Sequence, residues 1–461
     1  MTTNPGQAYA KMFPRAITTA GSHTAPTRQI ERLVRPFQEF VAREASGGIL
    51  LLLATAAALA WVNSSWAASY FALWHSTINI GLAGVTLDRD LHFWVNDGLM
   101  ALFFFVVGLE IKRELLAGEL ASLRQAALPI LAAVGGVAVP AVLYSVINLG
   151  GHGAPGWGIP IATDIAFVMG IMALLGRRVP TSLKVFMTAL AIVDDLAAVA
   201  VIALFYTARI AWGALGIAAV CFAALLLLNR LAVRHRLPYA LLGLFLWAAI
   251  LRAGIHPTIA GVLLAATIPC GRGLKPNQFL DKSRAVLKRL TRIAEGNANG
   301  ASETQQAAIR MLERSVEQMQ TPLFRWKHEL HPWVTFLVMP LFAFANAGLV
   351  FQGNVFANLL QTVPLGVVLG LLVGKPIGIT CASWLAVRAR VARLPQGITW
   401  IQLHAAGWLG GIGFTMSIFI AGLAFADEAM LNMAKLGIFG ASLLAGAVGT
   451  VLLLRRSRST G

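Results

Sequence analysis

The chain has 461 residues, of which 57% are hydrophobic and only 12% are charged, and its mean hydropathy is +0.71. Soluble domains carry about 25% charged residues, so this composition excludes a soluble globular protein and indicates a protein that crosses a membrane several times. The net charge of +17 does not indicate nucleic-acid binding, because the basic residues follow a membrane-topology pattern. The three cysteines lie in apolar segments without disulfide or metal-site spacing, and we expect no cofactor.

Residues 1–46 are expected to form a cytoplasmic tail. Within 29–44, apolar residues recur at helical spacing between arginines, which predicts an amphipathic helix. This helix could lie on the membrane surface or pack on a loop in the cytosol. The first long apolar run begins only near Gly47, so we expect no cleavable signal peptide.

Twelve apolar segments of transmembrane type follow, which predicts an all-α polytopic membrane protein over residues 47–454. They lie at 48–64, 93–118, 125–148, 157–176, 180–207, 210–229, 238–253, 255–270, 332–351, 362–386, 397–424 and 433–454. Between the first two, residues 78–91 alternate around glycines and predict a small β-hairpin outside the membrane.

The basic residues predict the orientation. If both termini and every second connection lie on one side, that side holds 32 of the 37 Lys and Arg residues. Because cytoplasmic loops carry the excess of Lys and Arg, we expect both termini in the cytoplasm and a multi-pass protein of the inner (plasma) membrane. Residues 271–331 then form a cytoplasmic insertion of unknown role, and 455–461 form a basic cytoplasmic tail.

Four ionisable residues stand at bilayer depth. Asp194 and Asp195 are adjacent in the fifth span, Asp164 lies in the fourth, and Lys375 lies in the tenth directly before a proline. An intramembrane carboxylate costs about 2.5–3.5 kcal/mol even on the lenient insertion scale, so these residues indicate function. The buried lysine needs a counter-charge, which the aspartates can supply. A static ion pair is the alternative, but three acids and one base leave an excess of −2, which mobile cations can neutralise.

Glycines interrupt the eleventh span. Four of them, with Gly411 and Gly413 among them, precede Thr415, and each disfavours helix by about 1 kcal/mol relative to alanine. Close helix packing is the alternative explanation. However, the fourth span carries a similar signal before Thr163, so spans 3–5 and 10–12 would form inverted repeats in which helices 4 and 11 are broken. Such paired breaks predict a midplane transport site, with Asp164 compensating the positive helix ends.

Seven motifs give the chain a family resemblance. It resembles the NhaA-type bacterial sodium/proton antiporter family in FWVNDGLM (93–100), VGLEIKRE (107–114), ATDIAF (162–167), AIVDDL (191–196), FAFANAG (342–348), GKP (374–376) and GIGFTMS (411–417). The resemblance implies a twelve-helix fold with crossed, broken fourth and eleventh helices. It also implies a homodimer joined through the hairpin at 78–91.

The resemblance implies roles for individual residues. Asp194 and Asp195 would carry Na⁺ (or Li⁺) and protons, with Thr163 and Asp164 beside them and Lys375 as the partner of Asp194. The residues implied in the cytoplasmic funnel and in the pH response are Glu110, Arg113, Glu114 and His256. One position departs from the family pattern, because Lys327 stands where the resemblance leads us to expect an acid.

Competition between ions follows from these residues. One carboxylate cannot hold a sodium ion and a proton at once, so each ion displaces the other. Two protons would neutralise an excess of −2 whereas one sodium ion leaves −1, which predicts electrogenic exchange of more protons than sodium, with no enzymatic activity. A sodium-coupled symporter is one alternative. An intramembrane aspartyl protease is another, since Asp164 and Asp194 could share a proton.

Overall fold

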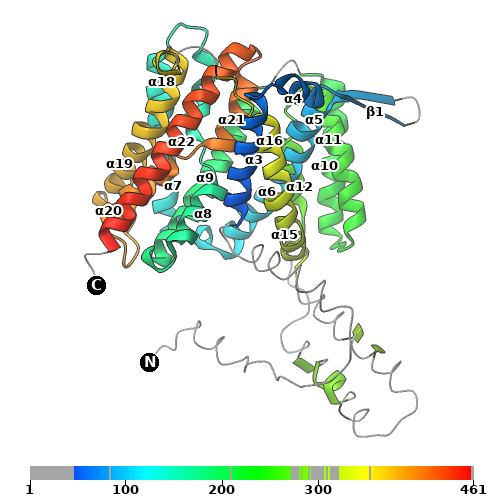
Figure 1. Ribbon diagram of the computed structural model, residues 1–461. Coiled ribbons are helices and arrows are strands. Elements are labelled where there is room, and N and C mark those ends of the chain that lie inside the picture. The colour runs from blue at the N-terminus through cyan, green and yellow to red at the C-terminus, as the bar shows by residue number, and fades with distance from the viewer. Residues whose placement is uncertain are drawn as a thin grey trace, which may run out of the picture.

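The computed structural model describes residues 46–82, 85–207, 210–270, 321–351 and 355–457, together with short helical pieces between 280 and 311. The predicted amphipathic helix at 29–44, most of the insertion and residues 458–461 of the basic tail lie outside the described residues. Within them, long helices run side by side in one bundle (Figure 1).

The elements follow one another along the chain with short connections. In the first half they are α3 (Ser46–Val62), α4 (Ala67–Trp74), β1 (Thr77–Leu82), β2 (Val85–Asp90), α5 (Leu91–Phe93), η1 (Trp94–Leu99), α6 (Met100–Ala117), η2 (Glu119–Ala121), α7 (Leu123–Ile147), η3 (Ala154–Ile161), α8 (Ile165–Leu175), η4 (Gly176–Arg178) and α9 (Thr181–Phe205). In the second half they are α10 (Trp212–Arg230), α11 (Arg236–Ala253), α12 (Ile259–Thr267), α15 (Pro322–Trp333), η5 (Val334–Val338), α16 (Met339–Asn346), α17 (Val355–Leu359), α18 (Thr362–Leu369), η6 (Gly370–Gly374), α19 (Lys375–Arg388), α20 (Trp400–Gly410), α21 (Phe414–Ala424) and α22 (Glu428–Ser457).

Among the described residues, eight helices are long and apolar enough to cross a membrane, or up to ten if each of two bent pairs counts as one span. The membrane-protein class is therefore confirmed, while the count of twelve and the inverted repeats stay predictions. Two segments show why fewer than twelve helices are long and apolar enough to count as membrane spans. The eighth predicted span contains only α12. The ninth predicted span, 332–351, continues a helix that begins at Pro322, inside the predicted insertion, in a stretch that carries charges.

The predicted hairpin is present. β1 and β2 form a two-stranded antiparallel sheet whose register runs from Thr77 opposite Asp90 to Leu82 opposite Val85. Figure 1 shows the hairpin reaching out sideways from one end of the helical bundle. An edge strand that projects in this way leaves backbone groups open for pairing with another chain.

Both predicted helix breaks are present, and they meet. α20 and α21 are bent by 45° at the glycine-rich connection that contains Gly411. The other break separates η3 from α8, where Ala162 and Asp164 have extended backbone. The Asp164 backbone N–H donates to the Ile412 carbonyl oxygen across 2.7 Å, which ties one break to the other. Unwound backbone at membrane depth is tolerated where protein covers it or where it lines a cavity, as at a transport site.

Close helix packing fixes the position of Lys375. α7 and α19 approach each other so closely that a Cβ added to Gly378 would lie 2.1 Å from the Gly135 carbonyl oxygen. Small residues permit this approach between transmembrane helices. Directly before Lys375, η6 is a wide π-type turn, and Pro376 is unable to donate the next helical hydrogen bond. The irregular turn therefore lies directly before the buried Lys375, the first residue of α19. Such π-type turns often occur at functional sites.

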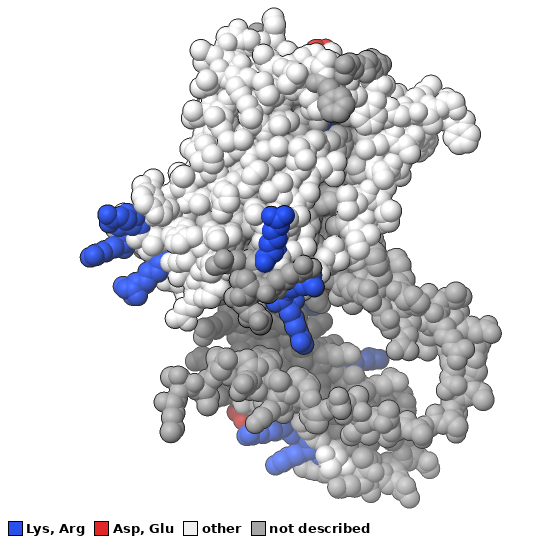
Figure 2. All heavy atoms as spheres, turned by 60° about the vertical axis from the view of Figure 1, so that its left-hand side comes forward, with Lys and Arg blue, Asp and Glu red and all other residues white. Residues whose placement is uncertain are grey.

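Basic residues are distributed unevenly over the surface. On the face drawn in Figure 2, Lys and Arg side chains lie toward the lower end of the bundle, and the side above them is almost free of charge. The exposed arginines in the connection after α8, at the end of α19 and in the connection after it are Arg177, Arg178, Arg388, Arg390 and Arg393. An uncharged belt with basic residues at one end suits a protein embedded in a bilayer.

Candidate functional site

Lys375 and Asp194 form a buried ion pair. The Lys375 Nζ atom lies 2.5 Å from Asp194 Oδ2, and both side chains are 0% exposed. The pair joins α19 to α9, and its two residues are 181 positions apart in the chain. Removing one partner from a buried pair is costly because the other charge is then left without compensation.

The Thr163 hydroxyl connects this pair to both breaks. Its Oγ1 atom lies 2.7 Å from Asp194 Oδ2 and 2.9 Å from the Gly410 carbonyl oxygen, and it accepts from Lys375 Nζ at 2.9 Å. A hydroxyl has only one proton to donate, so it serves either the carboxylate or the carbonyl at one time. Lys375, Asp194, Thr163 and the Gly410 carbonyl thus form one cluster. When the Thr163 hydroxyl donates to Asp194 Oδ2, the Gly410 carbonyl oxygen loses this hydrogen bond, and the reverse also holds.

Two buried carboxylate oxygens lack partners, one on Asp194 and the other on the next residue of α9, Asp195. Oδ1 of Asp194 and Oδ1 of Asp195 are buried and have no hydrogen-bond donor among the described residues. Asp194 is 1% exposed and Asp195 is 2% exposed. A buried anionic oxygen without a donor is unfavourable unless a proton or a metal cation satisfies it. These two atoms are therefore free to accept a proton or a cation.

Asp164 is placed differently. It caps α8, since its Oδ1 accepts from the Phe167 backbone N–H at 3.2 Å. Its Oδ2 accepts from the backbone N–H of Thr415, in the first turn of α21, at 3.1 Å, and from the Thr415 hydroxyl at 2.5 Å. Asp164 thus contacts the N-terminal ends of two helices, where a negative charge is stabilising. This is the position expected from the sequence.

The chain has close relatives of known family. The profile of the family described as Na⁺/H⁺ antiporter 1 matches residues 38–453. The chain belongs to the Na⁺/H⁺ antiporter 1 family. It is 50% identical over 430 residues, 93% of this chain and 96% of the relative, to "Na(+)/H(+) antiporter NhaA" of Oleidesulfovibrio alaskensis. It is 49% identical over 443 residues, 95% of each chain, to the protein of the same name from Koribacter versatilis.

Membership in the Na⁺/H⁺ antiporter 1 family confirms the resemblance seen in the seven motifs. It also places the chain among secondary transporters of the inner membrane, which rules against the protease alternative. Among the residues that the structure describes, no three His, Cys, Asp or Glu side chains gather as a metal-holding group.

The other predicted site residues, Glu110, Arg113, Glu114 and His256, make contacts of their own with other side chains. Glu110 of α6 pairs with Lys327 of α15, with Oε1 and Nζ 2.5 Å apart. Arg113 pairs with its neighbour Glu114, whose Oε2 accepts from the Glu119 backbone N–H at 3.1 Å. Lys327, which stands where the resemblance leads us to expect an acid, is therefore the direct partner of Glu110, a predicted funnel residue.

His256 lies against Asp97, a residue for which the sequence predicts no role. Its Nε2 atom is 3.4 Å from Asp97 Oδ1, and its Nδ1 atom is 2.8 Å from the Thr258 hydroxyl. The imidazole also meets the ring of Phe419 edge-on, so the pair is in contact with α21. Asp97 belongs to the FWVNDGLM motif (93–100), but no sequence spacing indicates that it meets His256.

Proposed function

We propose that the chain exports sodium from the cytoplasm in exchange for protons by competition of the two ions for Asp194 and Asp195. The observation that carries this proposal is the pair of buried carboxylate oxygens without donors beside the Lys375–Asp194 contact. The names of the relatives, Na⁺/H⁺ antiporter, support the same reaction.

The cluster offers oxygen ligands of the kind that a hard cation prefers. In our proposal, a sodium ion binds the carboxylates of Asp194 and Asp195, with the Thr163 hydroxyl and the Gly410 carbonyl as candidate neutral ligands. Lithium would bind the same oxygens. When protons occupy the carboxylates instead, the sodium ion loses its charged ligands and leaves. The coupling needs no further machinery, because the same atoms serve both ions.

The charges in the cluster favour unequal exchange. With Lys375 protonated, the three aspartates leave an excess of −2, and buried charge of this size is unfavourable. Two protons cancel it and one sodium ion does not, so we infer an electrogenic cycle that moves more protons than sodium. The proton gradient and the membrane potential would then both drive sodium export.

The direct test of the function is sodium-driven pH change in everted membrane vesicles. We expect sodium to dissipate a preformed pH gradient with no organic solute added. A symporter would need a solute, so a response only in the presence of an organic substrate would contradict the proposal. Vesicles without the protein are the baseline.

Substitution of two threonines distinguishes residues that bind the cation from residues that only stabilise the fold around the site. Thr163→Val removes the hydroxyl beside Asp194, and we expect the sodium concentration for half-maximal exchange to rise about tenfold, the worth of one hydrogen bond to a charged group. The matched change Thr415→Val removes the hydroxyl on Asp164 and is expected mainly to lower the melting temperature. Equal effects of both changes on sodium dependence would assign Asp164 to the cation site as well.

We further infer that pH regulation involves the residues of the cytoplasmic half of α6 and the Asp97–His256 pair. The proposed pH-responsive set is Glu110, Arg113, Glu114 and His256. Glu110 is held by Lys327, so its carboxylate carries a fixed counter-charge on α15. The contact of His256 with Phe419 gives this pair a route to the broken helix α21.

We also propose the finer architecture: twelve spans, with spans 3–5 and 10–12 as inverted repeats. The paired breaks in η3–α8 and α20–α21 support it, since such interrupted helices recur at corresponding positions of inverted repeats. The distribution of basic residues supports cytoplasmic termini, and the projecting hairpin at 77–90 supports a homodimer formed through it.

The cytoplasmic insertion lies outside the proposed repeats, so we expect it to be dispensable for exchange. Deleting residues 280–320 should leave the sodium-driven pH response within about twofold of the parent, because changes in surface loop length cost little free energy. The pH profile is the property that could shift. A deletion variant that inserts and folds but shows no exchange would make the insertion part of the transport machinery.

A further inference from the structure

Lys435 is a second buried lysine, and the proposed exchange does not use it. It lies on α22 and is 9% exposed, and the one hydrogen bond of its ammonium group within the described part of the chain goes to the Gly348 carbonyl oxygen, at 3.4 Å. Among the described residues, no carboxylate lies within ion-pair distance of it. Gly348 follows the C-terminal end of α16, whose dipole supplies only about half a negative charge. A full positive charge is thus left partly uncompensated.

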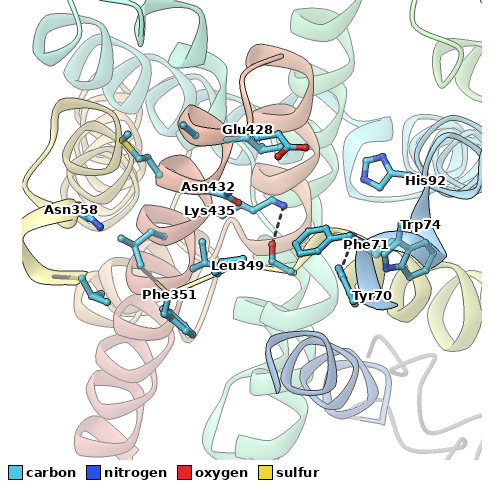
Figure 3. A pocket seen from close by; sticks show the side chains of 18 of the residues that line it. Tyr70, Phe71, Trp74, His92, Leu349, Phe351, Asn358, Glu428, Asn432 and Lys435 are labelled. Carbon is cyan, nitrogen blue, oxygen red and sulfur yellow. Dashed lines mark hydrogen bonds between the residues drawn. The ribbon is translucent and has the colours of Figure 1, made fainter. Parts of the chain in front are cut away.

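Lys435 lines a cavity of about 450 Å³ between α4, the segment after α16, and α22. The close view shows Lys435 reaching from α22 toward the wall formed by Tyr70, Phe71 and Trp74 (Figure 3). Trp74 is 4% exposed, and its indole N–H has no acceptor among the described residues. The Lys435 ammonium group has one acceptor for its three N–H bonds, and the Trp74 indole N–H has none, so both can donate to a ligand with an oxyanion.

The same cavity carries a negative charge and aromatic walls. Glu428, also on α22, lines it with an exposed side chain, so its carboxylate lies nearer to solvent than the ammonium group of Lys435. The aromatic lining residues are Tyr70, Phe71, Trp74 and Phe351. Aromatic faces together with a carboxylate attract ammonium groups, and quaternary ammonium groups in particular.

We propose that this cavity binds a zwitterion, with its oxyanion on Lys435 and Trp74 and its ammonium group toward Glu428 and the aromatic rings. Free betaines and the headgroups of phosphatidylethanolamine and phosphatidylcholine share this chemistry. A simple anion would meet Glu428 at the mouth, and a simple cation would meet Lys435 inside. The binding does not depend on the proposed exchange, because neither Asp194 nor Asp195 takes part.

The test is titration of the purified full-length protein in detergent with glycine betaine, followed by tryptophan fluorescence and melting temperature. We expect saturable binding, with acetate and tetramethylammonium each at least about tenfold weaker, since each keeps only one of the two charged contacts. Lys435→Met should weaken betaine binding at least about tenfold, and Glu428→Gln should weaken it several-fold. Asp281→Asn, an exposed carboxylate in the insertion, should change nothing.

Nanodiscs distinguish the two sources of the zwitterion. If a lipid headgroup is the occupant, betaine binding is seen in phosphatidylglycerol nanodiscs and is lost in phosphatidylethanolamine nanodiscs. If the occupant is soluble, betaine binds in both. Absence of saturable betaine binding in detergent and in phosphatidylglycerol would overturn the proposal, as would unchanged affinity in Glu428→Gln and Lys435→Met. Should Lys435→Met fail to fold, Glu428→Gln decides alone, because its position is exposed.

Discussion

Replacing Asp195 by asparagine is expected to abolish sodium/proton exchange and to leave a folded protein in the membrane. Asparagine keeps the volume of the side chain but neither releases a proton nor carries a charge for a cation. The Asp195 Oδ1 atom has no hydrogen-bond donor among the described residues, so the change breaks no contact through this oxygen. Loss of exchange would therefore report lost chemistry and not lost structure.

The measurement is the sodium-driven pH response of everted vesicles, with the amount of inserted protein and its melting temperature determined in parallel. The matched control is Asp281→Asn, the same chemical change at an exposed carboxylate, which should keep parental exchange. If folded Asp195→Asn protein retained a substantial pH response to sodium, Asp195 would not carry either ion.

The second large effect concerns stability. Lys375→Ala leaves the Asp194 carboxylate buried without its counter-charge, and we expect a loss of about 3–5 kcal/mol, seen as a clear drop in melting temperature. Asp194→Asn strands the lysine and should also destabilise. The double variant should lose less than the sum of the two losses, with a coupling of about 0.5–3 kcal/mol.

Lys375→Arg is the conservative control for this cycle. It keeps the positive charge and should be mildest in melting temperature, but it should slow exchange if the lysine releases its proton during the cycle, since arginine does not. All of these proteins are compared with the parent in one detergent. Strictly additive losses would mean that Lys375 and Asp194 do not stabilise each other, despite the 2.5 Å between their charged atoms.

The features that local chemistry dictates could be predicted from sequence. Alternation around glycines predicted the hairpin, and runs of glycine predicted the breaks, because both depend on neighbouring residues. The existence of an ion pair for Lys375 followed from the cost of burying a charge. Which carboxylate it meets came from the family resemblance, because no local pattern connects positions 181 residues apart.

The remaining contacts depend on helix packing, which has no local signal. The helix that contains the start of the ninth predicted span begins at Pro322, and the charges of Lys327 and Glu329 make this first part too polar for hydropathy to detect as part of a span. Their charges are paired, Lys327 with Glu110 of α6 and Glu329 with Arg236 of α11. The meeting of Asp97 with His256 and the cavity around Lys435 are likewise set by how the helices come together.

Proton release on sodium binding tests the competition most directly. Purified protein in weakly buffered detergent solution is mixed with sodium chloride, and the pH is followed, with choline chloride as the control for ionic strength. We expect a saturable release of protons that requires sodium or lithium and disappears in Asp195→Asn. Sodium binding without proton release at any pH where exchange occurs would contradict the claim that both ions compete for the same carboxylates.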